Sequence, residues 1–221
     1  MKYRYQLHTH TAPTSKCART TPAELAKALF EAGYAGCVVT NHFYHGNTGV
    51  SRELSWDDFV SAYERDYIEC RKEGEKYGLD IIFGIEEGVG EHNEILCYGI
   101  TPEMLYDHPE LRDGGTEKWC RVMHELGVFV IQAHPFRYPC SPISAELTDG
   151  IEVYNHSHNP EYNTRASEYA KEHGGIILTS GADTHDPKDV GCAGIATDTR
   201  IRDGRELCEL LRSGSYELLI P

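Results

Sequence analysis

The stretch Gln6-Leu7-His8-Thr9-His10-Thr11 follows a short alternating run, residues 1–6, that predicts the first β-strand. Side chains two residues apart on an extended chain point to the same side, so the two imidazoles share one face. Imidazole is the commonest metal ligand among side chains. The pair would therefore supply half of a metal site, unless both histidines simply face solvent near the terminus. The deciding question is whether carboxylates and further imidazoles reach the same end of a sheet.

Downstream of this stretch, short apolar segments alternate with helical segments. Residues 36–40 form an apolar run without alternation, which is typical of a strand buried on both faces. Strand–helix alternation predicts a parallel sheet, and seven or eight such units indicate a closed α/β barrel, although an open sheet fits the same pattern. Strands are expected at 1–6, 36–40, 79–84, 94–99, 128–132, 150–154, 176–179, 193–197 and 216–220, and helices at 22–32, 55–77, 116–126, 160–174 and 203–212.

The composition limits the classes of partner. The chain has 221 residues and a net charge of −14, which disfavours a nucleic-acid polymer or an anionic membrane surface as partner. No apolar run approaches the roughly 20 residues that span a bilayer. The chain contains eight cysteines, but no Cys-x-x-Cys pair and no apolar leader, so reduced thiols and a cytoplasmic location are expected.

Histidines and carboxylates gather at the predicted strand ends. The first strand is followed by His8 and His10, the second by His42, the third by Glu86 and the fifth by His134. The seventh strand is followed by two more candidates, Asp183 and His185. In a parallel α/β barrel all of these ends lie on the face that carries the active site. Imidazoles mixed with carboxylates suit a multinuclear Zn, Mn or Fe site better than a structural four-cysteine zinc site.

Taken together, these motifs resemble the PHP family, the polymerase and histidinol phosphatase superfamily. The motifs are His8-Thr-His10, Thr-Asn-His42, Gly-Ile-Glu86, His134-Pro and Ser-Gly-Ala-Asp183-Thr-His185, and they run in order along nearly the whole chain. The resemblance implies an α/β fold, a distorted seven-stranded (β/α)7 TIM-like barrel, as a single metal-dependent hydrolase domain over residues 1–221. It also implies two or three divalent metal ions and hydrolysis of a small phosphomonoester, as in histidinol phosphatases.

The resemblance also implies a distribution of the metal ligands. The first metal would be held by His8, His10 and Asp183, and Glu86 would bridge it to the second. The second metal would also be bound by His134, and the third by His42 and His185. Glu87 replaces Glu86 if the register of the third strand is shifted by one residue.

Two departures from the family pattern leave alternatives open. Where the family often has a histidine opening the fourth strand, this chain has Glu94, with His92 two residues earlier. We expect Glu94 to complete the second metal, with His92 as the alternative. Lys16 stands where histidinol phosphatases place a third-site histidine, and an ammonium has no lone pair with which to ligate. The third position would then have only two histidines, with Cys17 as a further candidate, so a two-metal and a three-metal enzyme both fit.

The charges of such a site predict its chemistry. Two neighbouring divalent metals lower the pKa of a shared water toward ~7, and the bridging hydroxide attacks phosphorus. Cationic side chains neutralise the phosphoryl oxygens, and a guanidinium can grip phosphate with two hydrogen bonds. Asp183 or His185 would carry protons. The candidates for substrate contact are Lys16, Arg19, Arg137, Arg165, Asn155 and His158, with Arg137 also assigned a catalytic role because it follows the His134-Pro135 turn.

Two other functions fit the same residues. A metal-activated hydroxide attacks a carbonyl as readily as phosphorus, so amide or lactone hydrolysis is the first alternative. A non-catalytic metal-binding domain is the second. The cationic residues near the predicted ligands favour the phosphorylated small molecule as substrate.

Overall fold

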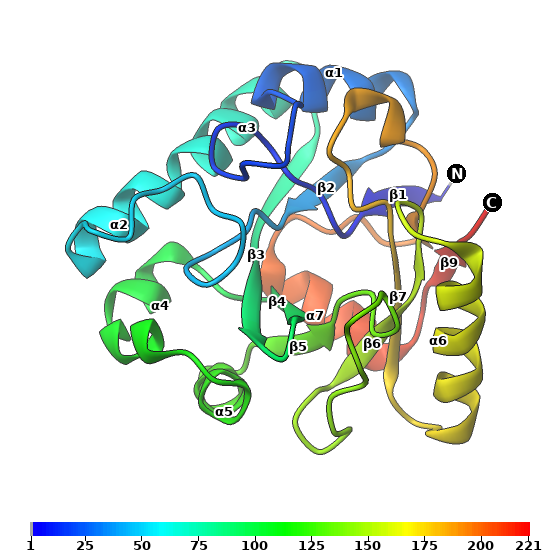
Figure 1. The fold of residues 1–221 in the computed structure, drawn as a ribbon. Helices are drawn as coiled ribbons and strands as arrows, with labels where there is room; N and C mark the ends of the chain where they lie inside the picture. The colour runs from blue at the N-terminus through cyan, green and yellow to red at the C-terminus, as the bar shows by residue number, and fades with distance from the viewer. Residues whose placement is uncertain (1) are drawn as a thin grey trace.

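The computed structural model describes residues 2–221, and its strands form one mixed sheet of nine strands. The strand order is β7-β6-β5-β4-β3-β2-β1-β8-β9. Figure 1 shows most of the helices around the outside of this sheet, with the last helix, Gly204–Ser213, behind its middle. The strands are β1 (Tyr3–Gln6), β2 (Gly36–Val39), β3 (Asp80–Gly90), β4 (Asn93–Tyr98), β5 (Phe129–Gln132), β6 (Gly150–Asn155), β7 (Ile177–Gly181), β8 (Gly194–Thr197) and β9 (Glu217–Leu219).

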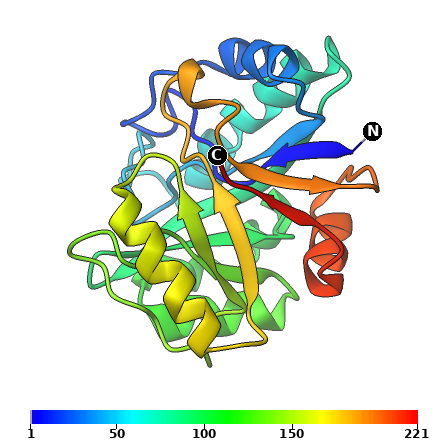
Figure 2. The same cartoon turned by 90° about the vertical axis from the view of Figure 1, so that its right-hand side faces the viewer.

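The two edges of the sheet meet at a seam, where β7 contacts β8 and β9. The hydroxyl of Ser180 on β7 donates to the carbonyl of Leu219 at 2.7 Å and accepts from the amide of Gly194 at 3.3 Å. The hydroxyl of Tyr216 donates to the carbonyl of Leu178 at 2.8 Å. Figure 2 shows β7 alongside the C-terminal strand. These contacts curl the sheet into a nearly closed barrel.

The expected α/β barrel is therefore confirmed as a class, but the count of seven parallel strands is wrong. No helix separates β3 from β4. They form an antiparallel hairpin whose turn residues, Glu91 and His92, both have positive φ values of 51° and 64°, as a tight hairpin turn with the right twist requires. The pairings β4–β5, β1–β8 and β8–β9 are antiparallel as well. The first predicted strand began at residue 1, which lies outside the described residues.

The helices follow the predicted positions with two differences. Thr21 and Glu24 form a capping box at the start of the first helix, and Pro22 takes its first position. The helix expected over residues 55–77 is divided into two at Glu64, and the helix expected over 116–126 begins at Thr116, with Gly115 as its N-cap. The helices are α1 (Pro22–Glu31), α2 (Trp56–Tyr63), α3 (Arg65–Glu75), α4 (Pro102–Tyr106), α5 (Thr116–Glu125), α6 (Pro160–Glu172) and α7 (Gly204–Ser213), with 3-10 turns η1 (Pro109–Asp113) and η2 (Pro187–Asp189). Within residues 2–221, none of the helices is long and apolar enough to cross a membrane.

An aromatic cluster fixes the chain beside the strand ends. Phe43, which is fully buried, meets four aromatic rings nearly edge-on, at centroid distances of 4.8–5.8 Å. Edge-to-face pairs of this kind add to the free energy gained by burial. The neighbouring residue is His42, so the cluster holds the end of β2 in place. The four rings belong to Trp56, Phe59, Tyr63 and Trp119.

Candidate metal centre

The predicted ligands meet at one end of the barrel. Single parallel bridges join Thr9 to Thr184 and His42 to Glu86, so the segments that follow β1, β2 and β7 are held side by side with β3. Thr9 forms the bridge to Thr184, and the side chains of His8 and His10 on either side of it are fully buried. The side chains thus come together as the strand-end argument expected, and their role as metal ligands stays a prediction.

The first group of potential ligands contains His8, His10 and Asp183. The Nε2 atoms of the two histidines lie 3.1 Å apart. The Oδ1 atom of Asp183 lies 3.4 Å from Nε2 of His8 and 3.1 Å from Nε2 of His10. One atom from each residue therefore falls within reach of a single ion.

Glu86 lies between this group and the next. Its Oε1 is 3.2 Å from Nε2 of both His8 and His134, and its Oε2 is 3.2 Å from Nε2 of His10 and 2.9 Å from Nδ1 of His42. A carboxylate in this position has one oxygen available to each of two ions. The next residue, Glu87, points to the opposite side of β3, where it accepts hydrogen bonds from His45.

Glu94, rather than His92, reaches the centre. Its two carboxylate oxygens lie 3.5 Å from Nδ1 of His42 and 3.5 Å from Nε2 of His134. His92 is exposed in the turn of the β3–β4 hairpin and belongs to no group of potential ligands among residues 2–221. The difference arises because Glu94 is on β4 itself, whereas His92 lies in the preceding turn with a positive φ of 64°.

The arrangement fits metal binding. His42 Nδ1 and Glu86 Oε2 are buried and, although 2.9 Å apart, are not aligned for a hydrogen bond. The Nε2 atom of His158 is also buried without a hydrogen-bond partner. Buried polar atoms are normally hydrogen-bonded, and each unpaired one requires an explanation. Convergence of imidazole nitrogens and carboxylate oxygens, some of them without a hydrogen-bond partner, is the geometry expected of ligands that share divalent ions.

The electrostatics of the cluster agree with this interpretation. Burial alone would lower the pKa of His8, but the carboxylates of Asp183, Glu86 and Glu152 raise it well above its ordinary value. Burial would raise the pKa of Glu86, but His8 and His42 hold it well below its ordinary value. The carboxylates therefore stay charged and need positive charge beside them, from protons or from metal ions.

The sequence did not reveal Glu152, which supports two of the ligands. This buried carboxylate of β6 lies 3.0 Å from Nδ1 of His8, and it accepts from the amide of His134 at 3.1 Å and from Nδ2 of Asn155 at 2.8 Å. A Cβ at Gly181 would lie 2.0 Å from Oε1 of Glu152, so only glycine leaves room for this contact. A carboxylate that holds the far nitrogen of a ligating histidine fixes its tautomer and orientation. The available signal was a charged residue inside an otherwise apolar strand.

A second support lies beside His10. Nδ1 of His10 is 3.1 Å from the hydroxyl of Ser15, which donates to Oδ1 of Asn41 at 2.8 Å. The same Asn41 oxygen accepts from the amide of Thr11 at 2.7 Å. Asn41 and Ser15 therefore orient the His10 ring without reaching the potential ligand atoms.

The predicted substrate-binding residues occupy different places. Nε2 of His158 lies 3.4 Å from Oδ2 of Asp183, close enough to share an ion with it and with His134. Asn155 is buried, and its amide donates to Glu152 and to Asp183. Arg137 reaches the cavity in front of the ligands, whereas Lys16 and Arg19 are exposed and do not line it, and Arg165 covers the ring of Phe136.

The cavity itself has a volume of about 210 Å³. The side chains around it combine potential metal ligands with one guanidinium and one thiol: Cys17, His42, Asn47, Glu86, Glu94, His134, Arg137, Asp183 and His185.

Comparison with known proteins gives the family. The model of the PHP domain matches residues 6–209. The chain belongs to the PHP domain family. No curated protein matches it significantly in sequence. The identification extends over all of the predicted ligands, from His8 to His185.

Solved structures show the same fold at low sequence identity. A two-domain protein from Bacteroides vulgatus that contains a predicted PHP-like metal-dependent phosphoesterase is 16% identical, with a TM-score of 0.71. The match covers 100% of this PHP domain chain and 65% of that protein. The lesion-specific endonuclease EndoQ from Pyrococcus furiosus is 15% identical, with a TM-score of 0.68 and coverage of 99% and 58%. An amidohydrolase from Chromobacterium violaceum with bound sulfate is 16% identical, with a TM-score of 0.59 and coverage of 94% and 96%.

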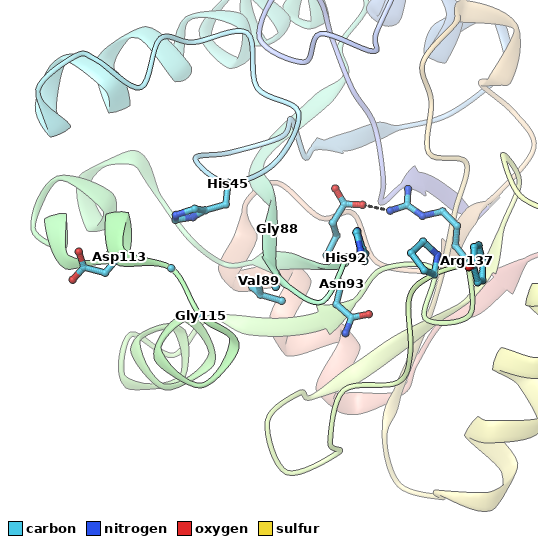
Figure 3. Close-up of a pocket in the computed structure, with 13 residues that line it drawn as sticks. His45, Gly88, Val89, His92, Asn93, Asp113, Gly115 and Arg137 are labelled. Carbon is cyan, nitrogen blue, oxygen red and sulfur yellow. Dashed lines mark hydrogen bonds and ion pairs between the residues drawn. The ribbon is translucent and has the colours of Figure 1, made fainter.

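A larger pocket opens beside the metal centre of this PHP domain. Its volume is about 590 Å³, and it shares Glu94 and Arg137 with the inner cavity. Figure 3 shows Arg137 paired with the carboxylate of Glu94 on one side of the pocket, and His45 and Asp113 on the other. The guanidinium nitrogen lies 2.6 Å from Oε2 of Glu94. The pocket therefore leads directly to the potential metal ligands.

The remaining predicted ligand, His185, lies beside a cysteine. Its Nε2 is 3.1 Å from Sγ of Cys17, and the rings of His185 and His42 stack against His10 at 4.6 and 4.5 Å. Burial alone would raise the pKa of Cys17, but hydrogen bonds with His185 and His42 lower it to about 5. Cys17 thus lies beside His42 and His185, the two histidines that the resemblance assigned to the third metal.

Proposed function

We propose that this PHP domain is a metal-dependent phosphoesterase that hydrolyses a small phosphomonoester, as histidinol phosphatases do. The observation that carries the proposal is the convergence of imidazole nitrogens and carboxylate oxygens, some of them buried and unpaired, beside one cavity. In this proposal His8, His10 and Asp183 hold the first ion, and Glu86, His134 and Glu94 hold the second. Divalent ions in these positions lower the pKa of water and neutralise charge on a phosphoryl group.

Arg137 is the residue that we assign to the phosphoryl group. Its guanidinium belongs to both the inner cavity and the outer pocket, and one nitrogen is committed to Glu94. A guanidinium has five N–H donors in a fixed plane, so donors remain for phosphoryl oxygens. Lys16 and Arg19 lie outside the cavity wall, and we assign them at most a role in attracting an anionic substrate.

The proton for the leaving alkoxide has two candidate carriers. Asp183 and His185 both line the cavity. Asp183 is charged, because His8 and His10 hold its pKa well below the ordinary value against the effect of burial, so it would have to accept a proton from the attacking water before passing it on. For His185 burial lowers the pKa, but the contacts with Cys17 and Asp183 raise it overall. Asn155 and His158, predicted to touch the substrate, both lie against Asp183, and we assign them to positioning that carboxylate.

The outer pocket favours a small leaving group over a polymer. Its volume of about 590 Å³ falls within the usual range for small-molecule sites. Proteins that bind nucleic acids normally bring positive charge to the phosphate backbone, whereas this chain has a net charge of −14. The endonuclease among the structural relatives makes a phosphodiester the substrate to test against this proposal.

The test combines metal analysis with a set of aryl substrates. The purified protein, loaded with zinc or manganese, is assayed with p-nitrophenyl phosphate, with the bis-aryl diester and with p-nitrophenyl acetate. We expect metal-dependent hydrolysis of the monoester, and its loss in His8→Ala and Asp183→Asn. His124→Ala is the matched control, because His124 is an exposed histidine paired with Asp149 outside the cluster. Preference for the diester or the acetate would overturn the proposed substrate class, and absence of bound metal would overturn the proposal as a whole.

A further inference from the structure

Cys17 occupies a fixed position beside the metal centre. Its half-buried side chain comes from the loop after β1, and its Sγ lies 3.1 Å from Nε2 of His185. Cys17, His42 and His185 all line the inner cavity. Three residues with soft or borderline donor atoms therefore border one space at the edge of the cluster.

An independent observation points to a ligand in this space. His42 is only 7% exposed, lines the cavity and has a buried Nδ1 with no hydrogen-bond partner. Its ring and that of His185 both stack against the ring of His10, at centroid distances of 4.5 and 4.6 Å. The three imidazoles each offer a nitrogen within 4.8 Å of the others. The unpaired Nδ1 of His42 is a donor atom that an ion at this edge could take up.

The backbone around Cys17 is held in place. The amide of Lys16 donates to the carbonyl of Asn47 at 3.0 Å, and the amide of Ala18 donates to the carbonyl of Ser15 at 3.2 Å. The amide of Arg19 donates to the carbonyl of His185 at 2.7 Å, which ties the cysteine loop to the loop after β7. The thiol is thus positioned against His185 before any ligand arrives.

We propose that Cys17, His42 and His185 form the third metal position, at the edge of the cluster, and that the Cys17 thiolate takes the place of a third imidazole. Lys16 cannot ligate, and the next residue supplies the missing donor. Sulfur ligands favour zinc or cobalt(II) over manganese or magnesium. Binding replaces the thiol proton, which is released to solvent, by a metal–sulfur bond. The inference rests on the proposed metal centre, and it would remove His185 from the candidate proton carriers because its nitrogen would bind the ion.

The test is spectroscopic and does not depend on turnover. The metal-free protein is titrated with cobalt(II), and we expect a thiolate-to-cobalt charge-transfer band in the near ultraviolet. Cys17→Ser should lose this band and bind one metal ion fewer per chain, with an unchanged melting temperature. Cys192→Ser is the matched control, because Cys192 is also half-buried but, unlike Cys17, does not line the inner cavity.

A second measurement uses the unmodified protein. Bound zinc should protect Cys17 from iodoacetamide, as followed by mass spectrometry, while Cys192 reacts at the same rate with and without zinc. Cobalt bound with the same spectrum in wild type and Cys17→Ser, or alkylation of Cys17 unaffected by zinc, would overturn the inference and leave the proposed function standing. Failure to bind any metal would instead contradict the proposed function.

Discussion

Replacing Glu152 by glutamine should weaken metal binding although Glu152 is not itself proposed as a ligand. All of its partners are donors: one oxygen faces Nδ1 of His8, and the other accepts from the amide of His134 and from Asn155. An amide has a single acceptor oxygen, so in Glu152→Gln an N–H group must face at least one donor. His8 then loses the contact that fixes its tautomer and ring orientation.

The size of the effect follows from these contacts. Loss of the residue that orients a metal-ligating histidine lowers metal affinity about 10- to 100-fold, equivalent to about 1.4–2.8 kcal/mol. Because Glu152 is 1% exposed, the unpaired donor also destabilises the metal-free protein, by about 1–3 kcal/mol. Zinc affinity is measured by competition with a chromophoric chelator, and stability by thermal unfolding of the metal-free protein.

The matched control for this variant is Glu87→Gln. Glu87 is equally buried and also contacts a histidine, but His45 lies outside the groups of potential ligands. We expect Glu87→Gln to lose stability while keeping wild-type zinc affinity. Wild-type zinc affinity in Glu152→Gln, or the same loss of affinity in both variants, would refute the role assigned to Glu152.

The other predictions concern protons, substrate and packing. Metal affinity should rise with pH, and metal binding should release protons. The carboxylates around His8 raise its pKa against the effect of burial, and this proton must leave before the nitrogen can bind a metal. Calorimetry in buffers of different ionisation enthalpy would contradict this prediction if no proton were released. Arg137→Ala should lower kcat/KM for the monoester about 10- to 100-fold, because charge-assisted hydrogen bonds worth about 1.5–3 kcal/mol are lost, and metal content should not change. A wild-type kcat/KM in steady-state kinetics would show that Arg137 does not bind the phosphoryl group. Phe43→Ala should destabilise the protein by about 3–5 kcal/mol, because a fully buried ring at the centre of the aromatic cluster is lost; a denaturant midpoint close to wild type would show that the cluster does not support the end of β2.

The strand ends could be predicted from the sequence because the relevant signals are local. An apolar run that stops at His42, and an alternating run that stops at His8 and His10, each place a ligand at the end of a strand. Parallel neighbours then bring these ends together without knowledge of side-chain contacts. Local signals did not fix the register of the third strand, so Glu87 remained an alternative to Glu86. The pairing of β3 with β4 settles this register.

What could not be predicted depends on contacts between distant segments. Glu152 acts through His8, and nothing in residues 150–155 indicates which strand lies opposite. Both strands of the β3–β4 hairpin were expected, but their antiparallel pairing was not, because Glu91 and His92 lack the Asn-Gly type of sequence that usually marks such turns. The count of seven parallel strands came from the family resemblance, whereas the segments expected along the chain already numbered nine.

Metal binding should also stabilise the seam of the barrel, which lies outside the cavity. His8 follows β1 and Asp183 follows β7, so an ion held by both would cross-link two segments separated by nearly the whole chain. The strands that close the barrel between them, β8 and β9, contribute none of the proposed ligands. Binding to the folded state alone suppresses every opening motion that separates the ligands. Backbone amides of β8 and β9 should therefore exchange with deuterium more slowly when the first metal position is filled, so hydrogen exchange in strands without ligands would report metal occupancy.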